Sequence, residues 1–83
     1  MENLNYREIG KRIQNKRKEL KITQEKLSEI IDVSPSYISE IERGSSICSL
    51  STIVNIAKNL DVSLDYLVFG ITEKILIKSL LIF

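Results

Sequence analysis

Along most of this chain, apolar residues recur at spacings of three and four, which is the pattern of amphipathic α-helices. In the second quarter of the chain two such stripes follow one another, separated by a short turn. They consist of Leu27, Ile30 and Ile31, and then Ile38 and Ile41. Thr23 and Ser34 are favourable N-cap residues, and Pro35 stands at a first helical position, where its missing N–H costs nothing. The pattern predicts two short helices, 24–31 and 35–43, arranged as a helix-turn-helix.

Three further helices are predicted around this pair. Asn5, followed three residues later by Glu8, indicates a capping-box start for a helix that runs to about Leu20. Ser49 and Ser63 are the expected caps of two later helices. The apolar positions that we expect on the inner faces of these three helices are Tyr6, Ile9, Ile13, Leu20, Leu50, Ile53, Val54, Ala57, Leu60, Leu64, Leu67 and Val68. Five helices with short links leave no room for a sheet, so we expect an all-α fold.

The last segment of the chain consists mostly of Ile, Leu and Phe. It fits either a sixth helix over about 73–81 or a strand, and we favour the helix because everything before it is helical. We therefore place one domain at residues 1–70, with its motif at 23–44, and an apolar C-terminal extension at 71–83. A large exposed apolar surface usually marks a partner interface. The expected homodimer interface consists of Val68, Phe69, Ile75, Leu76, Leu80 and Phe83.

The overall charge of this 83-residue chain is only +1, so bulk charge does not indicate a nucleic-acid partner. The distribution of charge is more informative. Between Arg7 and Lys26 there are eight basic and three acidic residues, a local net charge of +5, which leaves −4 for the remainder. A basic face on an otherwise acidic domain is a typical footprint for phosphates. The alternative is an ordinary solvated helix surface.

Several classes of protein are disfavoured by the composition. The single cysteine, Cys48, forms no internal disulfide, and the absence of histidine removes the commonest metal ligand and general base. A thiol near Arg43 suggests a lowered pKa and no more. No secretory signal is visible, and the apolar tail is too short to span a bilayer. We expect a cytoplasmic protein that is not an enzyme, without metal, cofactor, small-molecule ligand or membrane partner.

Arg17 lies four residues after Ile13, on the inward side of the first predicted helix. A buried guanidinium requires an acid, because an unpaired buried charge is very costly. Glu42, near the end of the second motif helix, is the natural candidate. The alternative is that Arg17 extends along the surface to reach water.

Together these residues resemble the phage-repressor type of helix-turn-helix, the Cro/CI or XRE-like family, from about Ile9 to Leu67. The resemblance is carried by Arg17, Thr23-Gln24-Glu25, Leu27, Val33-Ser34, Tyr37-Ile38-Ser39, Ile41-Glu42-Arg43-Gly44, Ser49-Leu50, Ile53, Ala57, Leu60, Val62-Ser63-Leu64 and Leu67. It implies a five-helix, lambda-repressor-like domain that binds double-stranded DNA as a two-fold dimer on a partly palindromic site. It also implies a buried Arg17–Glu42 ion pair, and a Gln24 that contacts a phosphate and braces the reading helix.

This chain departs from the family pattern at three positions. Ser28 stands where the family usually has Ala, which is a small change. Asp32 replaces the usual turn Gly, and Asp tolerates left-handed geometry better than most residues, at some cost in strain. Cys48 replaces a frequent Pro in the loop after the second motif helix, which makes that loop less rigid.

A helix-turn-helix unit places its second helix in the major groove, where its N-terminal turn and outward face meet base edges. The expected base-reading residues are Ser34, Pro35, Ser36, Tyr37, Ser39 and Glu40. The expected phosphate contacts are Gln24, Lys16, Lys26, Arg43, Ser45 and Ser46. For the serines the alternative is capping or plain exposure, and for Tyr37 it is packing against the preceding helix.

The function that follows from these predictions is that of a sequence-specific DNA-binding transcriptional regulator, most simply a repressor. The alternative is a protein-interaction module, an antitoxin-like or switch protein, whose apolar tail binds another chain. An enzyme is the least favoured class, since no Ser or Cys has a base at plausible spacing.

Overall fold

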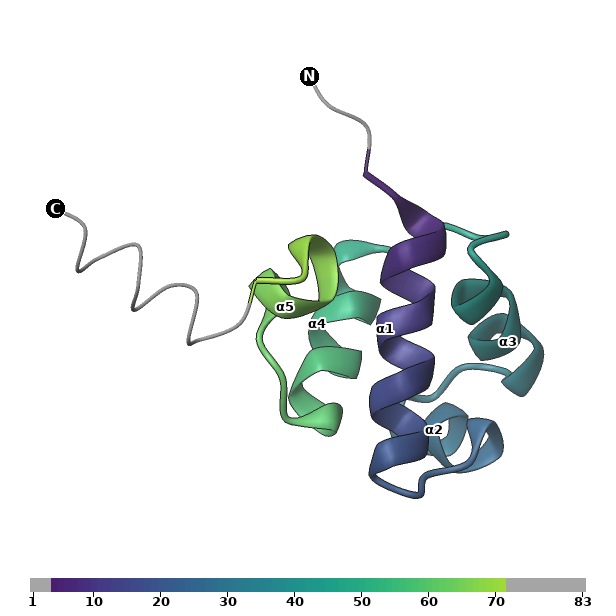
Figure 1. Cartoon of the computed structure of the whole chain (residues 1–83). Coiled ribbons are helices and arrows are strands. Elements are labelled where there is room, and N and C mark those ends of the chain that lie inside the picture. Colours follow the sequence, from purple (N-terminus) through teal and green to yellow (C-terminus); the bar gives the residue numbers. More distant parts are fainter. Residues whose placement is uncertain (1–3, 72–83) are drawn as a thin grey trace, which may run out of the picture.

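The computed structural model describes residues 4–71, which form five α-helices and no strand (Figure 1). The helices are α1 (Tyr6–Glu19), α2 (Gln24–Ile31), α3 (Pro35–Arg43), α4 (Leu50–Leu60) and α5 (Leu64–Phe69). The all-α prediction is confirmed for this part of the chain. The expected sixth helix, and the dimer positions Ile75, Leu76, Leu80 and Phe83, lie outside the described residues. Within the described range no helix is both long and apolar enough to cross a membrane.

Each helix begins at the cap that the sequence predicts. The cap side chains of Asn5, Thr23, Ser34, Ser49 and Ser63 accept hydrogen bonds from the backbone N–H groups of Glu8, Lys26, Tyr37, Thr52 and Tyr66, respectively. Each such cap is worth about 1 kcal/mol to the fold. Because capping depends only on residues within three positions, the sequence is sufficient to locate the starts of all five helices.

Helix α1 lies at the centre of the molecule, with α3 on one side and α4 and α5 on the other (Figure 1). Helix α2 closes the bundle against α3 and α4. The largest fully buried side chains come from all five helices, and they are Ile13, Leu27, Ile38, Ile41, Ile56, Leu60 and Leu67. One continuous core therefore holds the helix-turn-helix pair α2–α3 against the other three helices.

The approach of α1 to α3 is set by Gly10. A Cβ atom at this position would overlap the carbonyl oxygens of Ile41 and Glu42. The two helix backbones are therefore closer at Gly10 than any side chain would permit, and α3 sits directly against α1.

Some of the predicted inner-face positions are wrong. Leu20, Ile30, Leu50 and Leu64 are exposed, with Leu50 retaining 73% of its accessible surface. Leu50 and Leu64 lie in the first turn of α4 and α5, and Leu20 is the C-cap of α1, so in each case the stripe extends past the edge of the core. Ile30 lies to one side of the Leu27–Ser28 face that α2 buries. Conversely Ile56, absent from the predicted stripe, is fully buried between Ile53 and Leu60.

Candidate nucleic-acid interface

A buried ion pair joins α1 to α3. The Nε and Nη2 atoms of Arg17 donate to Oε2 and Oε1 of Glu42 at 2.7 and 3.0 Å, and Nη1 donates to the carbonyl oxygen of Ile22 at 2.8 Å. Both residues are buried. Among the described residues every buried side-chain nitrogen and oxygen has a hydrogen-bond partner. Since the pair is fully satisfied, removing either partner would leave a buried charge and cost about 3–5 kcal/mol.

Helix α2 joins the same network through Gln24. Its Nε2 atom donates to Oε1 of Glu42 at 3.0 Å. Arg17 of α1, Gln24 of α2 and Glu42 of α3 thus meet at one carboxylate. This contact braces α3 against α2, while one amide hydrogen and the oxygen of the half-buried Gln24 remain for a further partner.

The N-terminal turn of α3 is the most accessible part of the helix. Ser34, Pro35 and Ser36 are exposed. The Oγ of Ser34 accepts from the backbone N–H of Tyr37 at 3.1 Å, so this hydroxyl caps the helix and keeps its own hydrogen for donation. Tyr37 is half-buried and packs against the edge of the core. The exposed part of this turn can therefore meet another molecule without rearrangement.

Hydrogen bonds within the chain engage the second half of α3. The Oε1 atom of Glu40 accepts from the Ser46 hydroxyl at 2.6 Å, and the Glu40 carbonyl oxygen accepts from the Ser45 hydroxyl at 3.1 Å and from the Ser45 amide at 2.9 Å. Arg43 donates to the Ser39 hydroxyl. The bonds of Glu40 to Ser45 and Ser46 depend on the path of the loop after Gly44, so the sequence does not indicate them.

The two lysines that we expect at phosphates each have a carboxylate neighbour. Lys16 Nζ lies 3.2 Å from Glu19 Oε1, and Lys26 Nζ lies 4.0 Å from Glu29 Oε2. Both acids are exposed, and the more exposed lysine is Lys26. Such surface pairs contribute about 0–1 kcal/mol, so either lysine can exchange its partner for a phosphate at little cost.

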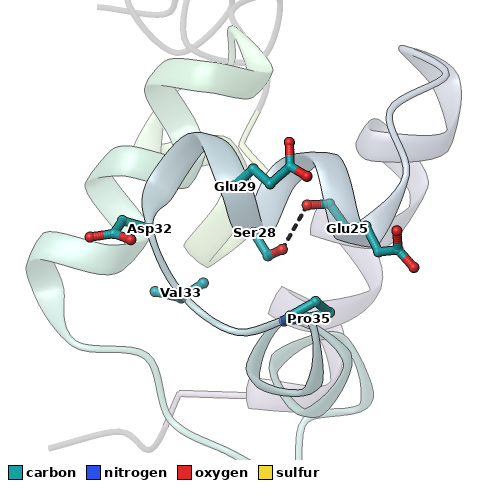
Figure 2. A pocket seen from close by; sticks show the side chains of 6 residues that line it. All are labelled: Glu25, Ser28, Glu29, Asp32, Val33 and Pro35. Carbon is teal, nitrogen blue, oxygen red and sulfur yellow. Dashed lines mark hydrogen bonds between the residues drawn. The ribbon is translucent and has the colours of Figure 1, made fainter.

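An acidic cleft lies between α2 and the start of α3 (Figure 2). Three acidic residues, Glu25, Glu29 and Asp32, line it, and their carboxylates point outward around it. The Ser28 hydroxyl donates to the Glu25 carbonyl oxygen at 2.6 Å. Pro35 lines the same cleft. Because carboxylates repel phosphates, this cleft marks one boundary of any nucleic-acid footprint on α3.

The environment of Cys48 differs from the sequence expectation. Cys48 is half-buried in the loop between α3 and α4, and this burial raises the pKa of its thiol. The suggestion of a lowered pKa from the neighbouring Arg43 is therefore wrong. A protonated, partly covered thiol is a poor nucleophile and gives no support to a redox role.

Arg12 was not singled out in the sequence, yet it connects α1 to the end of α5. Its Nη1 atom donates to the carbonyl oxygens of Leu67 and Val68 at 3.0 and 3.3 Å. These groups are 55 and 56 positions away in the chain, so no local pattern could have indicated the contact. The bond fixes the C-terminal turn of α5, on which the exposed Phe69 lies.

The comparisons with known proteins agree with this geometry. The Helix-turn-helix family (HTH_3) matches residues 13–67. The chain belongs to this family, in its Cro/CI or XRE-like branch of DNA-binding transcriptional regulators. A curated relative, the immunity repressor protein of Bacillus phage phi105, is 40% identical over 71 residues, which are 86% of this chain and 47% of that protein. This chain thus spans about half the length of that relative.

Two solved structures share the fold. The P22 c2 repressor, solved in complex with synthetic operator 9T, is 36% identical with a TM-score of 0.73, and the match covers 76% of this chain and 96% of that one. The master regulator for biofilm formation SinR, solved in complex with DNA, is 37% identical with a TM-score of 0.66, and the match covers 71% and 95%. The lambda-repressor-like fold expected from the resemblance is confirmed.

Proposed function

We propose that this protein is a sequence-specific transcriptional regulator of the cytoplasm that binds double-stranded DNA with α3 in the major groove. The observation that carries this proposal is the way α3 is held. The buried network of Arg17, Gln24 and Glu42 fixes the helix on α1 and α2. The fixed helix leaves its N-terminal turn, with Pro35 and Ser36, exposed. A rigid helix with an accessible first turn is the part of such a motif that meets base edges.

The chemistry of the turn defines what it would read. Serine hydroxyls at Ser34 and Ser36 donate or accept, so they discriminate weakly between bases. Pro35 offers only apolar contact, which suits a thymine methyl group. Tyr37 presents part of its ring at the rim of the same surface. Ser39 and Glu40 belong to the proposed reading set as well, and both would have to exchange the internal hydrogen bonds described above.

Phosphate contacts would fix the register of the protein on the duplex without reading its sequence. We assign this role to Lys16, Gln24, Lys26, Arg43, Ser45 and Ser46. The amide of Ser45 already donates within the chain, so the contact at this residue falls to its hydroxyl. The surface that approaches the backbone stops at the acidic cleft of Glu25, Glu29 and Asp32.

Repression and dimeric binding rest on different grounds. The named relatives include two phage repressors, one of them solved on an operator, and this supports a repressor. The exposed Phe69 and the half-buried Val68 at the end of α5 supply an apolar surface for a second copy. A two-fold dimer would bind a partly palindromic operator, with half-sites one helical turn apart.

Selection of bound duplexes from a random pool tests the function directly. We expect an enriched, partly palindromic sequence. Neutralisation of six to eight phosphates per dimer would make log affinity fall against log salt with a slope of about −5 to −7. A folded protein that enriches no sequence, or whose affinity hardly changes with salt, would contradict this docking. Failure to bind any duplex would favour the protein-interaction module instead.

A further inference from the structure

An apolar groove lies where α1, α4 and α5 meet. Its lining includes Tyr6 and Ile9 of α1, Ile47 and Cys48 of the loop between α3 and α4, Ile53 of α4 and Val68 of α5. Its volume is about 240 Å³. The lining carries no ionised side chain, so nothing in it favours a charged ligand.

The rim of this groove is unusually apolar for a surface. Ile47 and Leu50, both part of the lining, expose 65% and 73% of their area. Covering such surface removes apolar area from water, which is favourable. The rim and the groove together therefore favour an apolar occupant over water.

The chain itself supplies a candidate occupant, because residues 72–83 begin close to the groove. Val68 forms one wall of the groove, and the described chain ends three residues later at Ile71. Residue 72 must lie within about 14 Å of Val68, the greatest span of four residues. Seven of the twelve residues from 72 to 83 are Ile, Leu or Phe. Twelve residues reach about 18 Å as a helix and about 40 Å extended, so either conformation is long enough to return to Val68.

We propose that residues 72–83 of the same chain fold back and cover the groove formed by α1, the 44–49 loop, α4 and α5. A segment tethered beside its site has an effective concentration in the millimolar range, which a free competitor does not approach at ordinary protein concentrations. One groove cannot take seven large apolar side chains at once. The remaining ones, with Phe69, stay available for the proposed dimer.

The covered groove has a consequence for DNA binding that rests on the proposed function. Ile47 and Cys48 lie in the groove wall, and they directly follow Ser45 and Ser46, our expected phosphate contacts. A segment that packs on Ile47 and Cys48 would restrain this loop before DNA arrives. Such preorganisation lowers the ordering cost of binding and raises affinity without a new DNA contact.

Cys48 allows a test in which DNA takes no part, so its failure is separate from failure of the proposed function. The rate at which Cys48 reacts with a thiol reagent is measured in the full chain and in a full chain carrying Leu76→Lys, Leu80→Lys and Leu81→Lys. We expect the substituted chain to react about tenfold faster, which corresponds to a docked state favoured by about 1.4 kcal/mol. Far-ultraviolet circular dichroism must show the same helix content and cooperative melting in both chains.

A matched control places the thiol elsewhere. In a chain with Cys48→Ser and Lys58→Cys, the reporter lies on the exposed part of α4 outside the groove, and the tail substitutions should leave its reactivity unchanged. An unchanged rate at Cys48 overturns the proposal. Protection that disappears on dilution also overturns it, because the occupant would then be the segment of a second copy. Protection that persists on dilution supports the assignment to the same chain.

Discussion

Two turns of this molecule have nearly the same sequence and geometry but lead into helices with different surroundings. Residues 32–38 read Asp-Val-Ser-Pro-Ser-Tyr-Ile, and residues 61–67 read Asp-Val-Ser-Leu-Asp-Tyr-Leu. Asp32 and Asp61 are both left-handed, with φ of 58° and 57°. In each turn the valine N–H donates back to the preceding helix at 3.0 Å, and the serine accepts from the tyrosine N–H. The local sequence therefore sets where a helix begins and how the chain enters it.

The two helices differ in the residue that each exposes in its first turn and in the side chains that hydrogen-bond the helix to the rest of the molecule. Helix α3 exposes neutral Ser36 and continues to Glu42, whose carboxylate receives Arg17 and Gln24. Helix α5 exposes Asp65 and ends within six residues, where Arg12 donates to its last carbonyls. One turn geometry thus leads into a braced helix with a neutral first turn and into a short helix with an acidic first turn. Because phosphates repel an acidic turn, the neutral turn of α3 is the one that our proposal places on DNA.

The largest effect should come from removing the support of α3. Glu42→Gln leaves the buried Arg17 without its counter-charge, and we expect a loss of about 3–5 kcal/mol in the free energy of unfolding. The corresponding change at α5, Arg12→Met, removes hydrogen bonds to two carbonyls and should cost about 1–2 kcal/mol. Urea denaturation of both variants measures the difference. Equal losses would mean that the two helices are held with equal strength.

Exchanging the exposed residue of the two helices should change DNA affinity rather than stability. Ser36→Asp gives α3 the acid that α5 carries at Asp65, and we expect at least a tenfold loss of operator affinity, within the 1–3 kcal/mol typical of one base contact. Its free energy of unfolding should change by less than about 0.5 kcal/mol. Asp65→Ser, the reverse exchange, should leave operator affinity unchanged. A loss in both variants would place α5 on the DNA as well.

The two left-handed aspartates should respond alike. Asp32→Val and Asp61→Val each force a β-branched residue into left-handed backbone, and each should lose about 1–2 kcal/mol in the free energy of unfolding. Thermal unfolding of the pair measures whether the turns are equivalent. A much larger loss at Asp32 would show that the helix-turn-helix turn carries strain that its counterpart lacks.

The smallest effects concern the phosphate and base roles around α3. Lys26→Ala should weaken binding to all DNA sequences alike and reduce the salt slope by about 2, because each dimer loses two phosphate contacts. Lys58→Ala, on the exposed part of α4, serves as its matched control and should change neither quantity. Tyr37→Ala should instead change the sequence preference in a binding-site selection. An unchanged consensus would remove Tyr37 from the reading set.

The helix starts could be predicted because each depends on a cap within three residues, as at Ser34 and Ser63. The similarity of the two turns is visible in the sequence too, because both contain Asp-Val-Ser followed three residues later by a tyrosine. The wrong predictions of buried and exposed positions have a common cause in tertiary packing. Spacing alone placed Ile30 inward and overlooked Ile56, since periodicity does not define the width of a buried stripe.

In the candidate site, too, some features follow from neighbouring residues and others depend on tertiary packing. Exposure of Ser36 follows from its place in the first turn of a capped helix. From the residues alone Glu42 was the natural candidate partner of Arg17, but whether Arg17 is buried or reaches water stayed open. The family resemblance made the buried pair the expected arrangement. The bond from Ser46 to Glu40 depends on the path of the loop after Gly44, and the bond from Arg12 to Leu67 joins residues 55 positions apart. No rule based on neighbouring residues could have found them.

Because Arg17 and Gln24 both donate to the Glu42 carboxylate, a helix from outside the motif is needed in any isolated fragment of this domain. A peptide that contains only residues 23–44 would retain Gln24 and Glu42 but lose Arg17, which belongs to α1. Its acid would face solvent, and its two helices would have no third element to fix the angle between them. Any portable unit of this protein must therefore include the helix that precedes the motif.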